Sequence, residues 1–249
     1  MATTQTQLIP VMSRSFGSWQ LRIEREPLTT ESLAAQYDRA APTWTRITNK
    51  YGYEASYRKI FREFFAGQPD GVPCRPIRVL DVGVGAGAYS LALLDAYRAP
   101  NDLTAVDITS AMLDATATRQ AENGVHAQLC QADVRSLPNE PARFDLVIGA
   151  HVFEHLPDPV VAFADIKRVL RPGGWLVSCM TRQSWLGAYI QAKWRTHRVS
   201  KHRVVDWLQT AGLEATSHSP QPSGICRLTS LVAIAQKPAG NIEHLEHSQ

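Results

Sequence analysis

The segment Val79–Gly87, VLDVGVGAG, constrains the fold of this chain more than any other stretch of its sequence. An apolar run passes into glycines at alternate positions, and the apolar spacing of the AYSLALL that follows is typical of a helix. A strand that enters a glycine turn and then a helix leaves backbone N–H groups free at the end of a sheet, where ligands bind. The segment therefore predicts a strand, a turn and a helix, with a ligand site at the turn formed by Gly83, Gly85 and Gly87.

Strands and helices alternate beyond this turn. Helices are expected to begin near Gly87, Ser110 and Pro159. The candidate strands are Ile77–Asp81, Leu103–Asp107, Ala127–Gln131, Phe144–Gly149 and Gly174–Met180. Alternation of this length is typical of a parallel sheet with helices on both faces.

The order of elements changes after Met180. A polar insert over 181–200 is expected to precede a helix at Lys201–Ala211, and closing strands follow near Leu213–His218 and Cys226–Gln236. The short turn between these two strands implies an antiparallel pair at the edge of the sheet. The predicted fold class is therefore α/β, a Rossmann-like doubly wound sheet of seven strands, mostly parallel, with an antiparallel seventh strand at one edge.

The residues before the glycine turn indicate an arm and a helical cap. Trp19, Leu21 and Ile23 alternate with polar residues, as in a short strand. Thr29 or Thr30 can cap a helix, and a second helix fits Tyr53–Phe65. The expected units are a loosely held arm over 1–27, a helical cap over 28–70 that ends in a linker at Gln68–Pro76, a ligand-binding domain over 71–237 and a mobile tail over 238–249.

Composition limits the classes of protein to consider. With 249 residues, 44% of them hydrophobic, the chain can bury one sizeable core. A net charge of +3 is too mild to indicate nucleic-acid binding, and no apolar run approaches the roughly 20 residues that cross a bilayer. The four cysteines form no C-x-x-C pair, so neither a zinc site nor a disulfide framework is indicated. We expect a cytoplasmic monomer or homodimer that binds no metal, nucleic acid or membrane.

Asp81 favours one kind of ligand at the turn. Gly83, Gly85 and Ala88 fit the G-x-G-x-x-A fingerprint of dinucleotide-binding proteins. Asp81, however, occupies the last strand position, where it would repel an approaching pyrophosphate by on the order of a few kcal/mol. A cationic, phosphate-free nucleoside compound would be attracted instead. The alternative is a purely structural turn, in which the glycines only relieve crowding.

Together with the motifs that follow it, this segment resembles class I S-adenosylmethionine-dependent methyltransferases. DVGVGAG is similar to the first motif of that family, AVDITSAML to the end of its second strand, QADV to its adenine contact, and FDLVIGAHVFEHL and VLRPGGWLV to its fourth strand and the approach to its fifth. The resemblance covers Leu28–Lys237 and implies S-adenosylmethionine as the cofactor. An NAD-binding protein would also place an acid near Asp107, so Asp133, the Pro172–Gly174 turn and the final strand pair carry the distinction.

The resemblance implies roles for individual residues. Asp107 would accept both ribose hydroxyls of the cofactor. Tyr37 belongs to YDRAAPTW, which resembles a segment that folds over the cofactor near its methionine portion. The implied cofactor contacts are Tyr37, Asp81, Gly83, Gly85, Gly87, Asp107, Ile108 and Met112 against adenine, Asp133 and Val134 at the adenine edge, and the backbone of His151.

His151 and Tyr189 are the expected catalytic residues. His151 follows the fourth strand, at the rim where catalytic groups of such sheets gather, and its imidazole could act as a base. Tyr189 lies in the apolar half of Trp185–Arg203 and could reach the pocket. His155 is expected to be structural or to act through another residue.

Two groups of residues have two interpretations each. Trp44, Tyr51, Tyr53 and Tyr57 could line an acceptor cavity or pack the cap onto the sheet. The basic residues between Lys193 and Arg203 could bind a carboxylate or phosphate of the acceptor, or they could form a solvated connector.

The resemblance implies in-line transfer of a methyl group to a small-molecule acceptor, a reaction that depends chiefly on alignment and exclusion of water. The alternative is a cyclising lyase on the same fold, in which the cofactor's own amine attacks its γ-carbon to give methylthioadenosine and azetidine-2-carboxylate. That lyase requires a pocket with little room beside the cofactor. A third hypothesis is a non-catalytic cofactor-binding module.

Overall fold

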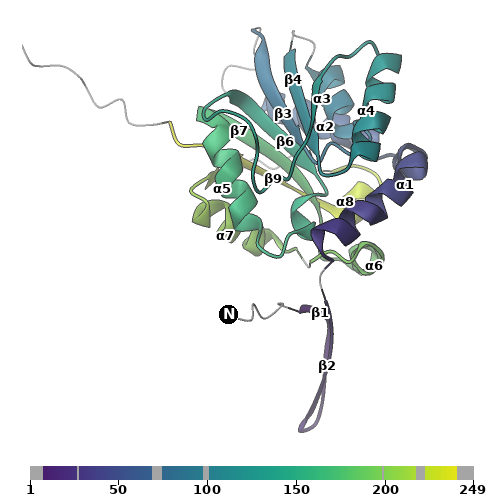
Figure 1. Ribbon diagram of the computed structural model, residues 1–249. Coiled ribbons are helices and arrows are strands. Elements are labelled where there is room, and N and C mark those ends of the chain that lie inside the picture. Colours follow the sequence, from purple (N-terminus) through teal and green to yellow (C-terminus); the bar gives the residue numbers. More distant parts are fainter. Residues whose placement is uncertain are drawn as a thin grey trace, which may run out of the picture.

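The computed structural model describes residues 8–26, 28–68, 75–97, 101–197, 199–216 and 222–239. Its centre is a seven-stranded sheet in the order β5-β4-β3-β6-β7-β9-β8 (Figure 1). The strands are β3 (Ile77–Val82), β4 (Asn101–Asp107), β5 (Gln128–Gln131), β6 (Phe144–Ala150), β7 (Leu170–Thr181), β8 (Glu214–Ala215) and β9 (Ser230–Gln236). Most of the expected linker and tail, at 69–74 and 240–249, lies outside the described residues.

Five strands of this sheet run parallel, and β9 runs antiparallel between β7 and β8. This arrangement confirms the predicted fold class, with the two-residue β8 as the outermost strand beside β9. Because β4, β3 and β6 are parallel neighbours, their carboxyl ends at Asp107, Val82 and Ala150 lie along one edge of the sheet. Ligands of open α/β sheets bind at this edge.

Helices cover both faces of the sheet because β3 is apolar on both of its faces. Leu80 faces a core that includes Phe163 of α5 (Pro159–Val169) and Leu208 of α7 (Lys201–Thr210). Val79 faces a second core with Phe61 of α2 (Tyr53–Ala66) and Leu93 of α3 (Ala88–Ala96). The second helix of the predicted alternating region, α4 (Ser110–Glu122), is capped by Thr109, whose hydroxyl accepts the Met112 N–H. Alternation of side chains along one buried strand thus builds both hydrophobic layers.

The cap consists of α2 and the long helix α1 (Thr30–Lys50). Thr29 is the N-cap of α1, as predicted, and its hydroxyl accepts the Ser32 N–H at 3.2 Å. Helix α1 crosses the carboxyl edge of the sheet, where the indole of Trp44 lies against the glycine turn. Figure 1 shows α1 beside α4 and above α6 at this end of the molecule.

Two expectations about the carboxyl-terminal third were wrong. The segment 181–200, expected to be a polar insert, contains helix α6 (Trp185–Trp194), which Ser184 caps through the Gly187 N–H. Its apolar residues lie around most of the helix, so no single stripe marks it in the sequence. The expected last strand begins later than predicted, since Cys226–Thr229 forms the single helical turn α8 before β9.

The arm forms a two-stranded hairpin of β1 (Ile9–Phe16) and β2 (Trp19–Arg25), which turns at Gly17 with φ of 59°. Figure 1 shows it projecting from the body of the molecule. Its base is held by Arg25, which donates to the carbonyls of Gln191 at 2.8 Å and Thr196 at 3.0 Å, at the carboxyl end of α6. The expected strand around Trp19–Ile23 is therefore one half of a ribbon tied to α6. Within the described ranges, every helix is too short or too polar to cross a membrane.

Candidate active site

A cavity of about 670 Å³ opens at the carboxyl edge of the sheet, between the glycine turn, α1 and α6. The predicted site residues on its wall are Tyr37, Gly83, Gly85, Asp107, Ile108, Asp133, Val134, His151 and Tyr189. Gly87, Met112 and Asp81 do not line it. Gly87 faces Thr116 of α4, and Met112 is buried within α4, so these two residues shape the turn and the helix behind the wall.

The glycine turn is conformationally specific. Gly83, Gly85 and Gly87 have φ of 64°, 55° and 75°, in the left-handed region that favours glycine. A Cβ at Gly83 would lie 2.2 Å from Cγ2 of Val152, whereas one at Gly85 would face the indole nitrogen of Trp44 at 3.6 Å. The turn therefore packs closely against the loop after β6 and lies under α1 without a side chain of its own.

Asp107 connects β4 to this turn. Its Oδ2 accepts the Gly85 N–H at 2.9 Å, and its Oδ1 accepts the Thr109 N–H at 3.0 Å. Burial raises the pKa of Asp107, while these backbone donors act in the opposite direction. A carboxylate can accept further hydrogen bonds, so Asp107 can brace the turn and still bind hydroxyl groups in the cavity.

Asp81 lies behind the turn and not at its lip, contrary to the expectation. The hydroxyl of Ser90, in the first turn of α3, donates to its Oδ2, which draws the side chain away from the cavity. Its Oδ1 is buried and has no hydrogen-bond partner among the described residues. Burial raises the pKa of Asp81 to about 7. Any electrostatic selection by Asp81 therefore acts through the turn, and a nearby cation would favour its ionised form.

Asp133 forms an ion pair that was not predicted. The guanidinium of Arg135 donates to both carboxylate oxygens, at 2.9 and 3.1 Å from its Nε, and lowers the pKa of Asp133. The same guanidinium donates to the hydroxyl of Thr30 at 3.0 Å. Arg135 thus ties the loop after β5 to the first residue of α1, which fixes one end of the cap over the cavity.

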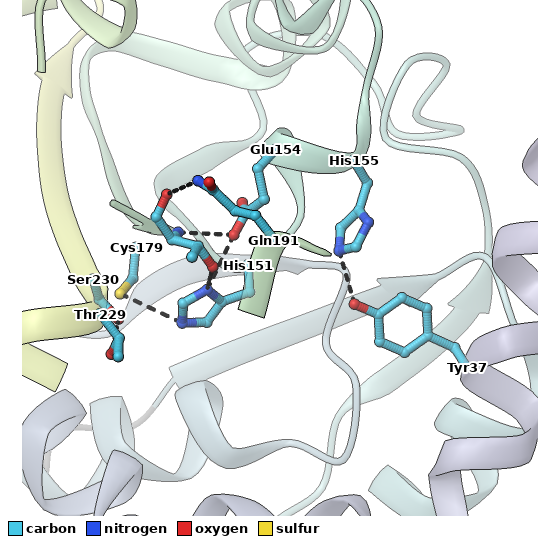
Figure 2. Close-up of polar contacts among 9 residues, drawn as sticks. Tyr37, His151, Glu154, His155, Cys179, Gln191, Thr229 and Ser230 are labelled. Atoms are coloured by element: carbon cyan, nitrogen blue, oxygen red, sulfur yellow. Dashed lines mark hydrogen bonds and ion pairs between the residues drawn. The ribbon is translucent and has the colours of Figure 1, made fainter. Parts of the chain in front are cut away.

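The other contact between cap and sheet is made by Tyr37 and His155. The phenol oxygen of Tyr37 lies 2.8 Å from Nε2 of His155 (Figure 2). Burial lowers the pKa of His155 to about 4, so its ring is neutral at neutral pH and forms one hydrogen bond with the phenol through Nε2. Tyr37 also stacks on Trp194 of α6, with ring centroids 5.3 Å apart, and Trp44 meets Trp194 edge-on at 5.1 Å. The role expected for His155, acting through another residue, fits this contact.

His151 is held by a network at the floor of the cavity. Its φ of 59° is unusual for a residue with a side chain, and its N–H donates to the carbonyl of Cys179 at 2.7 Å. Its Nδ1 lies 3.1 Å from both Oε1 of Glu154 and Oγ1 of Thr181 (Figure 2). Oε1 of Glu154 also accepts the Thr181 N–H at 2.8 Å.

Glu154 and His151 each shift the pKa of the other. Burial raises the pKa of Glu154, but His151 and the Thr181 N–H outweigh it and lower the value to about 2. Burial lowers the pKa of His151, but Cys179 and Glu154 outweigh it and raise the value well above the usual range. Glu154 is therefore a carboxylate that favours a protonated His151. Oε2 of Glu154 is buried without a hydrogen-bond partner in the part of the chain that the structure describes.

Aromatic rings line the cavity beside His151. Tyr53 meets the His151 ring edge-on at 5.7 Å, Tyr57 lies 5.8 Å from Tyr53, and Tyr89 lies 4.8 Å from Tyr57. All three tyrosines line the cavity, and Tyr57 and Tyr89 also belong to the core beneath α2. The two interpretations of Tyr53 and Tyr57 therefore both apply, because the rings that pack the cap also form the wall.

The basic residues between Lys193 and Arg203 point in different directions. Lys193 lies over the ring of Trp194, and Arg195 donates to the carbonyl of Glu26 at 2.8 Å. Lys201 and His202 begin helix α7, and Arg198 lies outside the described residues. Lys193 also lines the cavity, so only the placement of the other residues favours the interpretation of the segment as a connector.

Comparison with known proteins agrees with the site. A family model described as a methyltransferase domain matches residues 80–178. The chain is 31% identical over 150 residues to a ubiquinone biosynthesis O-methyltransferase of Xylella fastidiosa. The matched region covers 58% of this chain and 60% of that protein. It is also 31% identical over 115 residues to a demethylmenaquinone methyltransferase of Staphylococcus aureus. This second matched region covers 46% of this chain and 47% of that protein. The chain thus spans about half to two thirds of the relatives it matches.

Residues 80–178 are similar to a methyltransferase domain, and the chain resembles class I S-adenosylmethionine-dependent methyltransferases. The solved structure of the [4+2]-cyclase SpnF has the same fold, with a TM-score of 0.67 at 16% identity, over 86% of this chain and 98% of that one. At this identity the similarity shows the fold alone, and a protein of this fold is named for chemistry other than methyl transfer.

The wall residues fit S-adenosylmethionine, the cofactor of the family. The glycine turn presents backbone without side chains, and Asp107 supplies a carboxylate beside it. Because a nearby cation favours the ionised form of Asp81, whose Oδ1 has no partner among the described residues, a cationic amino-acid group would be favoured at the turn over a pyrophosphate. Asp107, Ile108, Asp133 and Val134, which were expected to contact the cofactor, lie together on the wall of this cavity.

Sequence reasoning missed Glu154. The residue stands three positions after His151 in HVFEHL and directly before His155. The two histidines are the more usual catalytic candidates, because imidazole titrates near neutral pH. The spacing of His151 and Glu154 could have indicated the pair only if the backbone between them were known to turn. The short 3₁₀ helix Phe153–His155 supplies that turn.

Proposed function

We propose that this protein is an enzyme that transfers a methyl group from S-adenosylmethionine to a small-molecule acceptor. The observation that supports the proposal best is a single cavity with two kinds of wall. One part contains the glycine turn and Asp107, and the other contains aromatic rings around the His151–Glu154 pair. A cofactor and an acceptor therefore have separate places within one enclosure.

S-adenosylmethionine supplies a methyl group bound to a sulfonium, which is a good leaving group. The chain's own residues have to hold the two reactants in line and exclude water. Asp107 would bind the ribose hydroxyls and Ile108 would pack on the adenine. The rings of Tyr37, Trp44 and Trp194 close the cavity from the side of α1 and α6.

His151 is proposed as the base that takes a proton from the acceptor. Its ring lines the cavity, and Glu154 is positioned to stabilise the imidazolium that forms. The raised pKa makes the neutral imidazole a stronger base, suited to a hydroxyl acceptor, and this neutral form predominates only above that pKa. The names of two relatives, from ubiquinone and menaquinone biosynthesis, favour testing ring hydroxyl compounds first.

The cyclising lyase has less support. It would need a cavity that the cofactor nearly fills, whereas the wall here extends from the glycine turn to Tyr51, Tyr189 and Ile225 on three different elements. That extent leaves space for a second molecule. Tyr189 lies at the outer end of this space, which fits a contact with the acceptor better than proton transfer at the reacting atom.

Product analysis tests the proposal. Purified protein is incubated with S-adenosylmethionine alone, and then with a panel of small hydroquinones, catechols and phenols, and the products are identified by mass spectrometry. S-adenosylhomocysteine that forms only with an acceptor, together with a product heavier by one methyl group, is the expected result. Methylthioadenosine and azetidine-2-carboxylate from the cofactor alone would establish the lyase instead. Absence of all these products, with intact cofactor binding, would contradict the enzyme and favour a binding module.

A further inference from the structure

Exposed apolar side chains gather at the mouth of the cavity. Among the described residues, ten large hydrophobic side chains are exposed, and five of these belong to the hairpin or to Leu8, the residue before it. Two of the other five, Tyr51 (47% exposed) and Tyr189 (66%), line the cavity and therefore mark its mouth. Trp185 (80%) lies one helical turn before Tyr189 on α6, and Leu228 (49%) adjoins the start of that helix. Such a cluster on the surface of a soluble domain marks a binding surface more often than chance exposure. These four residues are called the mouth patch below.

Helix α6 joins the mouth patch to the interior of the cavity. Trp185 and Tyr189 are four residues apart and therefore lie on the same side of the helix. Leu186 and Ile190, one position further along, line the cavity. Both sides of α6 are thus apolar, one towards the cavity and one towards solvent.

The patch and the cavity form one continuous surface. The rings of Tyr51 and Tyr189 line the cavity although about half or more of each is exposed. Leu228 adjoins the start of α6, because the hydroxyl of Ser184 donates to its carbonyl oxygen. A molecule that leaves the cavity past Tyr189 would therefore come near Trp185, one helical turn away, and near Leu228 at the start of the same helix.

Another part of the cavity wall is polar. There the buried carboxylate of Glu154 and the ring of His151 lie beside the edge of Tyr53. A ligand complementary to this cavity has a polar group at one end, a flat body against aromatic walls, and an apolar part that emerges at the mouth.

We propose that the acceptor is amphiphilic, with a hydroxyl-bearing ring at His151 and an apolar chain that leaves between Tyr51 and Tyr189 and lies along Trp185 and Leu228. This inference rests on the proposed function, because it names the class of acceptor for the same site. The continuity of the patch with the cavity favours a chain of the acceptor over a lipid surface or a second copy of the protein. Neither a lipid surface nor a second copy of the protein would extend along the cavity wall into the interior.

A series of 4-alkylphenols tests the proposal. The dissociation constants of 4-methylphenol and 4-heptylphenol are measured by calorimetry with protein saturated with S-adenosylhomocysteine, below the concentration at which the longer phenol aggregates. Burial of a methylene contributes about 0.8 kcal/mol, or about fourfold in affinity, and a half-exposed surface about twofold. Six methylenes should therefore make 4-heptylphenol at least about 30-fold tighter than 4-methylphenol.

Two variants assign this chain-length effect to the mouth patch. The double substitution Trp185→Ser/Leu228→Ser should reduce the affinity ratio of the two phenols by about tenfold or more. Val161→Ser, at the exposed apolar side chain on α5 away from the mouth, should leave the ratio unchanged. An affinity that does not depend on chain length, or a ratio that survives the double substitution, would overturn the proposal.

Parallel measurements distinguish other occupants and a failure of the proposed function. Light scattering reports the oligomeric state, and sedimentation with phosphatidylcholine/phosphatidylglycerol vesicles reports lipid binding. If the double substitution changes either of these and leaves the phenol ratio intact, the patch binds a second copy or lipid and the inference is wrong. Formation of S-adenosylhomocysteine from short phenols tests methyl transfer independently. Transfer without a chain-length effect overturns only the inference.

Discussion

Nδ1 of His151 lies 3.1 Å from Oε1 of Glu154, and the same carboxylate oxygen accepts the Thr181 N–H at 2.8 Å. The two residues are three positions apart, and they meet because His151 has φ of 59° and a 3₁₀ turn follows it. A side chain held in the left-handed region by surrounding contacts is a feature of functional sites. The pair is the most specific chemical element of the cavity beyond the cofactor motifs.

The first prediction concerns the pH dependence that Glu154 imposes on His151. Glu154→Gln removes the negative charge that helps raise the pKa of His151, so the pH at which the imidazole loses its proton should fall. The rising limb of kcat/KM against pH, measured by S-adenosylhomocysteine formation, should therefore move to lower pH, with a lower maximum. Glu122→Gln on the exposed side of α4 is the control and should keep the wild-type profile. A Glu154→Gln profile that coincides with the wild type would remove the pair from the mechanism.

The second prediction concerns stability in acid. The pKa of Glu154 is lowered from 4.5 to about 2 in the folded protein. A depressed pKa stabilises the fold above the unfolded value, and this contribution is lost as pH falls from about 4.5 towards 2. The free energy of unfolding, from urea denaturation, should therefore fall more steeply over this range in the wild type than in Glu154→Gln. Parallel curves would show that the pKa of Glu154 is the same in the folded and the unfolded protein.

The third prediction separates crowding from backbone strain in the glycine turn. Gly83 and Gly124 have φ of 64° and 65°, but only at Gly83 would a Cβ meet another atom, Cγ2 of Val152 at 2.2 Å. Gly124→Ala should cost about 1 to 2 kcal/mol of stability, from the left-handed conformation alone. Gly83→Ala should cost at least about 1 kcal/mol more and weaken cofactor binding. Equal losses in urea denaturation would mean that the turn is not closely packed.

The fourth prediction concerns the expected ribose ligand. Asp107→Ala should weaken S-adenosylmethionine binding by about 1 to 3 kcal/mol, through lost hydrogen bonds to a charged group. Asp114→Ala, at an exposed position of α4, should bind the cofactor like the wild type. Calorimetry that finds the same affinity in Asp107→Ala would show that the second-strand motif is misassigned.

The fifth prediction separates catalysis from cofactor binding. His151→Ala should slow turnover strongly with little change in cofactor affinity, because the side chain faces the aromatic part of the cavity. Tyr189→Phe should have a smaller effect, since Tyr189 is largely exposed at the mouth. Turnover that is unchanged in both variants would remove both residues from the set of catalytic candidates.

Most strands of the sheet, and the wall residues expected to contact the cofactor, could be predicted from the sequence. Strands such as β3 and β4 are short apolar runs bounded by Asp81 and Asp107, and the motifs around them have a fixed order, so both the fold and the wall residues could be predicted. Helix α6 could not, because Trp185, Tyr189 and their neighbours are apolar on two sides and give no single stripe.

The remaining site features depend on contacts that span the chain. Arg135 meets Thr30 across 105 positions, and Tyr37 meets His155 across 118. Nothing in the local sequence around these residues indicates their partners. The burial of Asp81 likewise depends on Ser90 at the start of α3, so its side chain turns away from the lip where its place on the strand suggested it would lie.

The central claim is that this cavity binds a phosphate-free, cationic adenosine compound, and calorimetric titration tests it most directly. Wild-type protein is titrated in parallel with S-adenosylmethionine and with NAD. One-to-one binding of S-adenosylmethionine, weakened in Asp107→Ala, together with no heat of binding from NAD, is the predicted result. Saturable binding of NAD at the same site, with no binding of S-adenosylmethionine, would contradict the claim.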